Sequence, residues 1–286
     1  MTSAPYNLYL PKRRETCVVF ASPHSGRVYP QAFLAATVLD ERTIRTSEDA
    51  FVDELLAAVP TFGAPLLTAN TPRAYLDLNR GADELDPAVI EDARSFAHNP
   101  RVASGLGVIP RVVAGGRAIY RGKLPMSEAR TRIRDLWQPY HDCLGRLLDE
   151  SRSHFGQAIL IDVHSMPHEA MEAIPARAGR RPEVVIGDRY GASAAGDVVT
   201  GIEDAFRAQG FQVARNAPFA GAYITQTYGR PGIQQHAVQI ELDRALYMDE
   251  RVIAPHARFG DFRARLEPVL RAIATLGRPE ARLAAE

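Results

Sequence analysis

Unbroken apolar runs that alternate with helical segments restrict the fold of this chain more than any other feature. Residues 158–163 form the clearest run, with five apolar residues and a single aspartate. Similar runs occupy residues 17–22, 184–187 and 237–242. A strand that lacks polar–apolar alternation is buried on both faces, which is typical of a parallel sheet covered by helices. The runs therefore predict a mostly parallel sheet at the centre of the fold.

The segments between these runs complete the expected α/β pattern. Apolar spacing predicts helices at residues 50–59, 127–155, 192–209 and 257–276, and shorter strands at 65–69, 74–78 and 211–214. In the longest helix, Ser127 is the expected N-cap and Gly156 the expected end. Residues 81–118 and 166–182 are rich in Gly and Pro and predict irregular surface segments. We expect one α/β domain over residues 1–286, with a mostly parallel mixed sheet and helices on both faces.

Composition excludes several classes of protein. The 34 Lys and Arg balance the 34 Asp and Glu, so the chain lacks the basic excess of a nucleic-acid binder. No run approaches 18 apolar residues, and residues 1–14 contain no apolar stretch of signal-peptide length. The two cysteines, Cys17 and Cys143, are too few for a disulfide framework and are expected to be small core residues. We therefore expect a cytoplasmic protein without nucleic-acid or membrane partners.

Polar residues that follow the apolar runs are candidates for a functional site. His24 follows the first run and His164 ends the clearest one, while Glu241 lies inside a third. Asn79 and Arg80 follow a fourth predicted strand. In open α/β sheets, ligands bind at the carboxyl ends of the strands. Two imidazoles and one carboxylate are a common catalytic zinc set. A carboxylate within an apolar strand is costly unless it is paired or faces a polar cleft.

The third ligand of such a set should be acidic. Glu48 and Asp49 stand together at the start of a predicted helix, whose dipole would stabilise either carboxylate. Each of these residues also has a simpler structural interpretation. A single histidine after a strand is often only hydrogen-bonded in the core, and Asp49 could be a helix cap. Residues 77–80 could form a turn with a surface ion pair.

Taken together, these segments resemble the N-formylglutamate amidohydrolase family. The matching segments, in the order of the family, are Ser-Pro-His-Ser-Gly at 22–26, Glu-Asp-Ala-Phe-Val-Asp-Glu-Leu at 48–55, Asp-Leu-Asn-Arg at 77–80, Ile-Tyr-Arg at 119–121, Asp-Val-His-Ser at 162–165, Gly-Ala-Tyr-Ile-Thr-Gln-Thr-Tyr-Gly-Arg-Pro at 221–231, His-Ala-Val-Gln-Ile-Glu-Leu at 236–242 and Tyr-Met-Asp at 247–249. Each segment alone is only moderately specific, whereas the ordered set is strongly specific. The resemblance covers most of the chain and implies a fold similar to that of zinc carboxypeptidases.

The resemblance implies a metal set. It makes His24 and His164 ligands of one zinc ion, with the acidic ligand in the segment that contains Glu48 and Asp49. In the related carboxypeptidases the acid follows the first histidine by three residues, and this chain has Arg27 there. The acid must therefore come from the later segment. Asp49 is the better match, and Glu48 is the alternative.

The resemblance also implies catalytic and substrate-binding roles. Glu241 matches the catalytic glutamate of the related carboxypeptidases, and Asn79 and Arg80 match their carboxylate-binding pair. One of the arginines, Arg80 included, is expected to stabilise the developing oxyanion. Glutamate carries two carboxylates, so a second cation is expected. The candidates for further substrate contacts are Arg121, Arg230 and Tyr223.

The implied activity is metal-dependent hydrolysis of N-formyl-L-glutamate to L-glutamate and formate, in the setting of histidine breakdown. One alternative is a deacylase for another N-formyl or N-acyl amino acid, differing in the loops at 81–118 and 166–182. A second is a catalytically silent binding protein, although no expected ligand or catalytic residue is missing. A nucleotide-binding protein lacks support, because no Gly-rich phosphate loop follows the first strand. The expected partner is a small N-acyl amino acid, and the sequence gives no oligomeric state.

Overall fold

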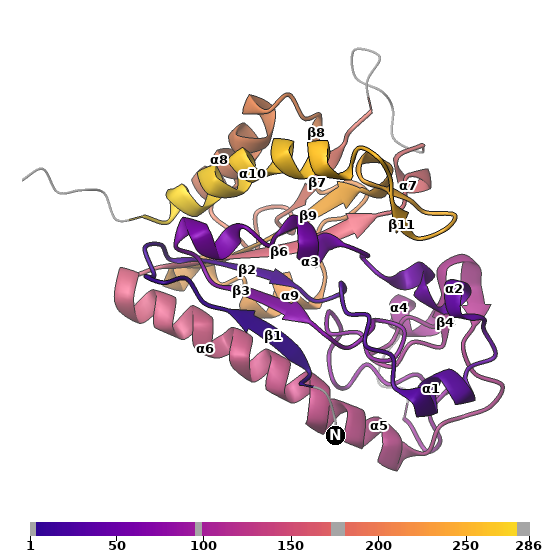
Figure 1. Ribbon diagram of the computed structural model, residues 1–286. Helices are drawn as coiled ribbons and strands as arrows, with labels where there is room; N and C mark the ends of the chain where they lie inside the picture. Colours follow the sequence, from indigo (N-terminus) through magenta and orange to yellow (C-terminus); the bar gives the residue numbers. More distant parts are fainter. Residues whose placement is uncertain (1–3, 95–98, 173–180, 279–286) are drawn as a thin grey trace, which may run out of the picture.

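A seven-stranded mixed sheet forms the centre of the protein (Figure 1). The computed structural model describes residues 4–94, 99–172 and 181–278. The strands, in their order across the sheet, are β1 (Tyr6–Tyr9), β3 (Leu66–Ala69), β2 (Val18–Ser22), β6 (Ala158–Met166), β9 (Gln235–Asp243), β7 (Val184–Gly187) and β8 (Val213–Arg215). β1 and β3 are antiparallel, as are β7 and β9, and the other neighbours run parallel. The expected mostly parallel α/β sheet is confirmed.

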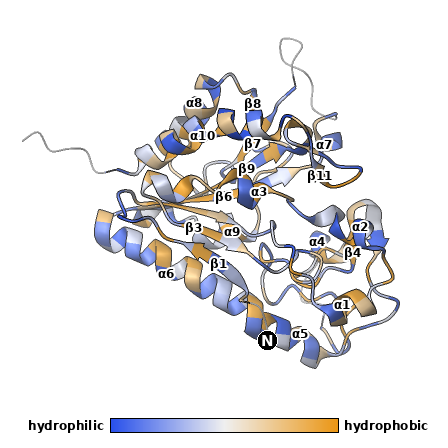
Figure 2. Ribbon diagram, in the orientation of Figure 1, coloured by the Kyte–Doolittle hydropathy of each residue, from blue (hydrophilic) through white to orange (hydrophobic). Residues whose placement is uncertain are grey.

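Helices cover both faces of this sheet. A long helical segment made of α5 (Met126–Arg132), a π-helical turn (Ile133–Trp137) and α6 (Gln138–Phe155) packs on one face. On the other face lie α8 (Gly196–Ala208) and α10 (Phe259–Leu276) (Figure 1). Figure 2 shows hydrophilic and hydrophobic residues alternating along α6, as expected for a helix with one face in water. Every residue of β2, β6 and β9 is buried, which explains their lack of alternation.

Residues 74–78 are not a strand, although their apolar spacing predicted one. Pro72 starts a tight turn, and its carbonyl oxygen accepts hydrogen bonds from the backbone N–H groups of Tyr75 and Leu76. The N–H of Asp77 donates to the carbonyl oxygen of Val108 instead of to a neighbouring strand. The apolar side chains are still buried, so the pattern reported burial correctly but not the backbone conformation.

The predicted helix boundaries need two further corrections. Residues 50–59 form only the short α3 (Val52–Leu55), because Phe51 adopts a left-handed backbone with φ of 67°. The long helix begins at Met126 after Pro125, so Ser127 lies inside the helix and does not cap it. Its end at Gly156, with φ of 75°, is confirmed.

The predicted irregular segments contain only short elements. Within 81–118 these are α4 (Pro100–Ala103), β4 (Val112–Val113) and β5 (Arg117–Ala118). Within 166–182, β6 extends to Met166 and α7 (Glu169–Glu172) follows. Residues 95–98 and 173–180 of these two segments lie outside the described part of the chain. The other short elements are α1 (Gln31–Ala36), α2 (Glu41–Ile44), α9 (Tyr223–Tyr228), β10 (Met248–Asp249) and β11 (Ala254–Pro255).

Two expectations from composition concern the core and the membrane. Cys17 and Cys143 are buried and unpaired, as expected for small core residues. Among the described residues, no helix combines the length and the apolar character that crossing a bilayer requires.

Candidate active site

Four segments that are far apart in the sequence meet at the carboxyl edge of the central strands. His24 lies two residues beyond the end of β2, and His164 lies near the end of the neighbouring β6. Glu241 is the direct cross-strand partner of His164 in β9. Asp49 comes from the loop before α3, and its backbone N–H donates to the carbonyl oxygen of His24. Gly26 lets the chain after His24 pack directly on the backbone of residues 70–71, because a Cβ there would lie 2.1 Å from the carbonyl oxygen of Thr71.

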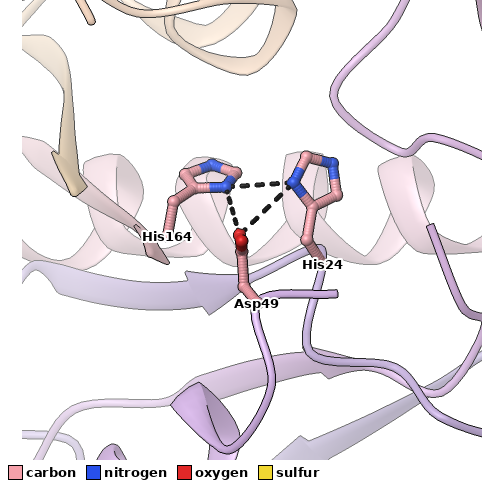
Figure 3. A group of neighbouring side chains, drawn as sticks. All are labelled: His24, Asp49 and His164. Carbon is pink, nitrogen blue, oxygen red and sulfur yellow. Dashed lines mark hydrogen bonds and ion pairs between the residues drawn. The ribbon is translucent and has the colours of Figure 1, made fainter. Parts of the chain in front are cut away.

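His24, Asp49 and His164 direct one ligand atom each toward a common point (Figure 3). The Nδ1 atoms of the two histidines are 3.1 Å apart. Oδ2 of Asp49 lies 3.0 Å from Nδ1 of His164 and 3.5 Å from Nδ1 of His24. All three side chains are buried.

The other ring nitrogen of each histidine, Nε2, faces a carboxylate oxygen. Nε2 of His24 is 2.7 Å from Oδ1 of Asp77, and Nε2 of His164 is 3.0 Å from Oδ2 of Asp162. A proton on each Nε2 leaves a lone pair on each Nδ1. Three lone pairs thus converge in a buried site, and ligand atoms around a tetrahedral zinc ion are likewise about 3.3 Å apart. The donor set therefore fits a divalent metal ion.

The charge around this point also favours a cation. Burial raises the pKa of Asp49, but contacts with His164 and His24 outweigh it and hold that pKa well below its usual range. For His164, burial acts to lower the pKa, yet the carboxylates of Asp162 and Asp49 raise it well above its usual value. The raised pKa of His164 reports the negative potential of these carboxylates, and the lowered pKa of Asp49 keeps its carboxylate charged.

The structure separates the two candidate acidic residues. Both oxygens of Glu48 are held by Arg45, at 3.0 and 3.1 Å, and the hydroxyl of Tyr29 donates to Oε1 at 2.7 Å. Glu48 is therefore occupied in an ion pair away from the histidines. Of the two residues, only Asp49 directs a carboxylate oxygen at them.

Arg244 holds Asp49 in place, a contact that the sequence did not reveal. Its Nη2 donates to Oδ1 of Asp49 at 3.1 Å, and its Nε donates to the hydroxyl of Ser165 at 3.1 Å. This pairing occupies Oδ1 and leaves Oδ2 directed at the histidines. The expected role of a helix dipole is wrong, because α3 begins three residues later and has only four residues. Arg244 directly follows β9, which is the one signal in the sequence that could have pointed to it.

We expect Arg244→Gln to weaken metal binding roughly 10–100-fold, because partners that orient a ligand commonly contribute that much. The measurement is the dissociation constant for zinc, by competition with a chromophoric chelator. Arg251→Gln is the matched control, since Arg251 is exposed and pairs only with Asp249 among the described residues. Equal zinc affinity in the two variants would show that Arg244 does not orient Asp49.

Glu241 lines a cavity of about 530 Å³ that also contains the three converging residues. Its Oε1 accepts a hydrogen bond of 2.8 Å from Nε2 of Gln239, two residues earlier on the same face of β9. Burial raises the pKa of Glu241 to about 7, although the positive charge of His164 opposes the shift. A carboxyl group with this pKa can both accept and release a proton near neutral pH.

Asn79 and Arg80 line the same cavity. Nδ2 of Asn79 is 3.3 Å from Nε2 of His164, and its Oδ1 accepts from the N–H of Ile224. The guanidinium of Arg80 donates to the carbonyl oxygens of Leu106 and Asn79 and is almost fully buried. Burial therefore lowers the pKa of Arg80 from its usual value. Such a buried cation attracts an anion in the cavity.

Three residues from the predicted substrate site are not among those that line the cavity. Arg121 and Arg230 are both exposed, and Nε of Arg230 donates to the carbonyl oxygen of Thr227. Tyr223 packs on Trp137 and His141 behind the site. Besides Arg244, two arginines that the sequence did not single out line the cavity, namely Arg73 and Arg101. Neither follows an apolar strand, so the sequence pattern contains no signal for them.

Comparison with known proteins gives a consistent result. A profile of the N-formylglutamate amidohydrolase family matches residues 16–248. The N-formylglutamate deformylase of Pseudomonas aeruginosa is 31% identical over 265 residues, which are 92% of this chain and 91% of the relative. The enzyme of the same name from Pseudomonas putida is 29% identical over 237 residues, 82% of each chain.

A solved structure agrees with these relatives. The N-formylglutamate amidohydrolase of Ralstonia eutropha superposes with a TM-score of 0.88 at 34% identity, covering 96% of this chain and 98% of that one. A gene product of Agrobacterium tumefaciens shares the fold, with a TM-score of 0.59 and 17% identity over 95% of this chain and 96% of that one. The profile match covers well over half of the chain and agrees with the fold. The chain therefore belongs to the N-formylglutamate amidohydrolase family and is a hydrolase that acts on an amide bond.

Proposed function

We propose that this enzyme hydrolyses N-formyl-L-glutamate to L-glutamate and formate with the help of one zinc ion. The observation that carries the proposal is the convergence of His24, Asp49 and His164 next to Glu241 in one cavity. The names of the relatives supply the substrate, since the two Pseudomonas enzymes are N-formylglutamate deformylases.

In this proposal, three residues bind the metal and a fourth residue transfers the proton. His24, Asp49 and His164 hold the metal, which when bound polarises a carbonyl oxygen and acidifies water. Glu241 takes a proton from a water molecule as the oxygen of that water adds to the formyl carbon. Glu241 then delivers that proton to the amide nitrogen as the C–N bond breaks, which releases formate and the free amine. The pKa of Glu241, raised to about 7 by burial, suits both transfers.

Arginines on the cavity wall bind the charged parts of the substrate. The fork of Arg80 is oriented by two backbone carbonyls and is suited to the α-carboxylate, with Asn79 beside it. Nε of Arg73 donates to Asp77 at 3.0 Å, which fixes that guanidinium close to Glu241 and Asp49. Arg73 can therefore donate to the oxyanion that develops on the formyl oxygen.

The test is a formate-release assay on purified protein whose metal content is measured in parallel. We expect turnover of N-formyl-L-glutamate that is lost with a chelator and restored by zinc. N-acetyl-L-glutamate and N-formyl derivatives of other amino acids complete the panel. A higher kcat/KM for one of these would assign the enzyme to another deacylase activity. Absence of turnover in the zinc-loaded protein would leave a binding protein that keeps the fold.

A further inference from the structure

Two of the arginines that line the cavity have no acidic partner in the described part of the chain. The other two, Arg73 and Arg244, form ion pairs with buried carboxylates. Among residues 4–94, 99–172 and 181–278, no carboxylate oxygen lies within 4.0 Å of the guanidinium nitrogens of Arg80 or Arg101. These two cavity-lining guanidinium groups thus have no direct carboxylate partner within the ranges just given.

These two guanidinium groups act on each other. Burial is the main cause of the lowered pKa of Arg80. The negative charge of Asp77 opposes this shift, and the positive charges of Arg73 and Arg101 add to it. Nε and Nη1 of Arg80 are held by the carbonyl oxygens of Leu106 and Asn79, so Arg80 cannot turn away. Anionic groups bound in the cavity would relieve this repulsion, which favours a ligand with more than one negative charge.

Arg101 lies farther from the metal site than Arg80 does. Arg80 adjoins Asn79, whose amide contacts His164. Arg101 stands close enough to Arg80 for its charge to act on that guanidinium. Arg101 is exposed and stands in the short α4, in the segment at 81–118 that covers the cavity from outside the sheet. The order along the cavity is therefore metal site, Arg80, Arg101.

This order matches the order of charges in a glutamate derivative. The α-carboxylate is one carbon from the amide nitrogen, and the side-chain carboxylate is separated from that nitrogen by three carbons. Apolar parts of Leu106, Pro110 and Val112 line the cavity and can contact the two methylene groups. We propose that Arg101 binds the side-chain carboxylate of the substrate and so selects glutamate derivatives. This inference rests on the proposed function and adds the residue that determines specificity.

The test compares two substrates that differ in one charge. For Arg101→Gln, we expect KM for N-formyl-L-glutamate to rise about tenfold with kcat nearly unchanged, as for a charged contact at a partly exposed site. KM for N-formyl-L-glutamine should change by less than about twofold, because that substrate has no side-chain charge to lose. Arg101→Lys should recover part of the preference for glutamate. Equal effects on the two substrates, or no effect on either, would overturn the inference.

Two further variants make the result specific. Arg130→Gln removes an exposed arginine of α5 that does not line the cavity, and it should leave both KM values unchanged. Arg121→Gln tests the residue that the sequence suggested for a second carboxylate. A selective loss of N-formyl-L-glutamate binding in Arg121→Gln, with none in Arg101→Gln, would assign the carboxylate to Arg121. Failure of the proposed function is distinct, because the unmodified enzyme would then not release formate from N-formyl-L-glutamate.

Discussion

Replacing His164 with alanine is expected to remove both the bound metal and the amidase activity while the chain stays folded. His164 supplies one of three ligand atoms, and its Nδ1 lies close to both of the others. The remaining histidine and aspartate cannot enclose a divalent ion with comparable affinity, because catalytic zinc sites ordinarily use three protein ligands. We expect activity to fall by more than about a thousandfold, since metal assistance contributes several kcal/mol to the transition state.

Metal content per chain and formate release test this expectation on the same sample. Circular dichroism and a thermal melt show whether the fold is retained. We expect that it is, because β6 is mostly apolar and buried throughout. His154→Ala is the matched control, because His154 is exposed on α6 and is neither one of the three converging residues nor part of the cavity lining. Wild-type turnover by His164→Ala would rule out the metal mechanism.

Glu241→Gln is expected to separate metal binding from catalysis. Glutamine has nearly the same shape, and Glu241 is not one of the three converging ligands, so the metal should stay bound. The amide cannot accept the proton from water, and loss of a general acid–base group commonly costs about 10²–10⁴-fold in kcat. KM for N-formyl-L-glutamate should change little, because the contacts proposed for the substrate carboxylates are those of arginines.

The control for this variant is Glu267→Gln, which alters a half-exposed residue of α10 that pairs with Arg271. It should match the unmodified enzyme in both metal content and kcat. Near-normal kcat in Glu241→Gln would assign the proton transfer to another group. Loss of the metal in that variant would instead make Glu241 a ligand.

The sequence predicted the buried strands well because burial on both faces leaves a clear pattern. The runs at β2, β6 and β7 are apolar or nearly so, the run at β9 has four apolar residues of six, and each run forms a strand. The pattern could not predict that β7 runs antiparallel to β9, because a strand buried on both faces looks the same in either direction. It also missed β1, a short edge strand with alternate residues half buried.

The local sequence pattern predicted only those site residues that lie in or next to apolar strands. His24, His164 and Glu241 follow or end apolar strands, so their convergence could be expected from sheet topology. The choice between Glu48 and Asp49 depends on the backbone around Phe51 and on Arg45 and Arg244, none of which the local pattern reveals.

The arginines were harder to predict still. Arg73 lies within a turn, and Arg101 belongs to a segment with weak periodicity. Their approach to the cavity is a property of the tertiary structure alone. Arg121 stands in a matching family segment but is not among the residues that line the cavity, and this too is a property of the tertiary structure.

Anomalous diffraction at the zinc absorption edge, from crystals of active protein, tests the central claim most directly. The expected result is one peak per chain, about 2 Å from Nδ1 of His24, Nδ1 of His164 and Oδ2 of Asp49. A peak at other residues, or no anomalous peak at any metal edge in crystals that release formate from N-formyl-L-glutamate, would contradict it.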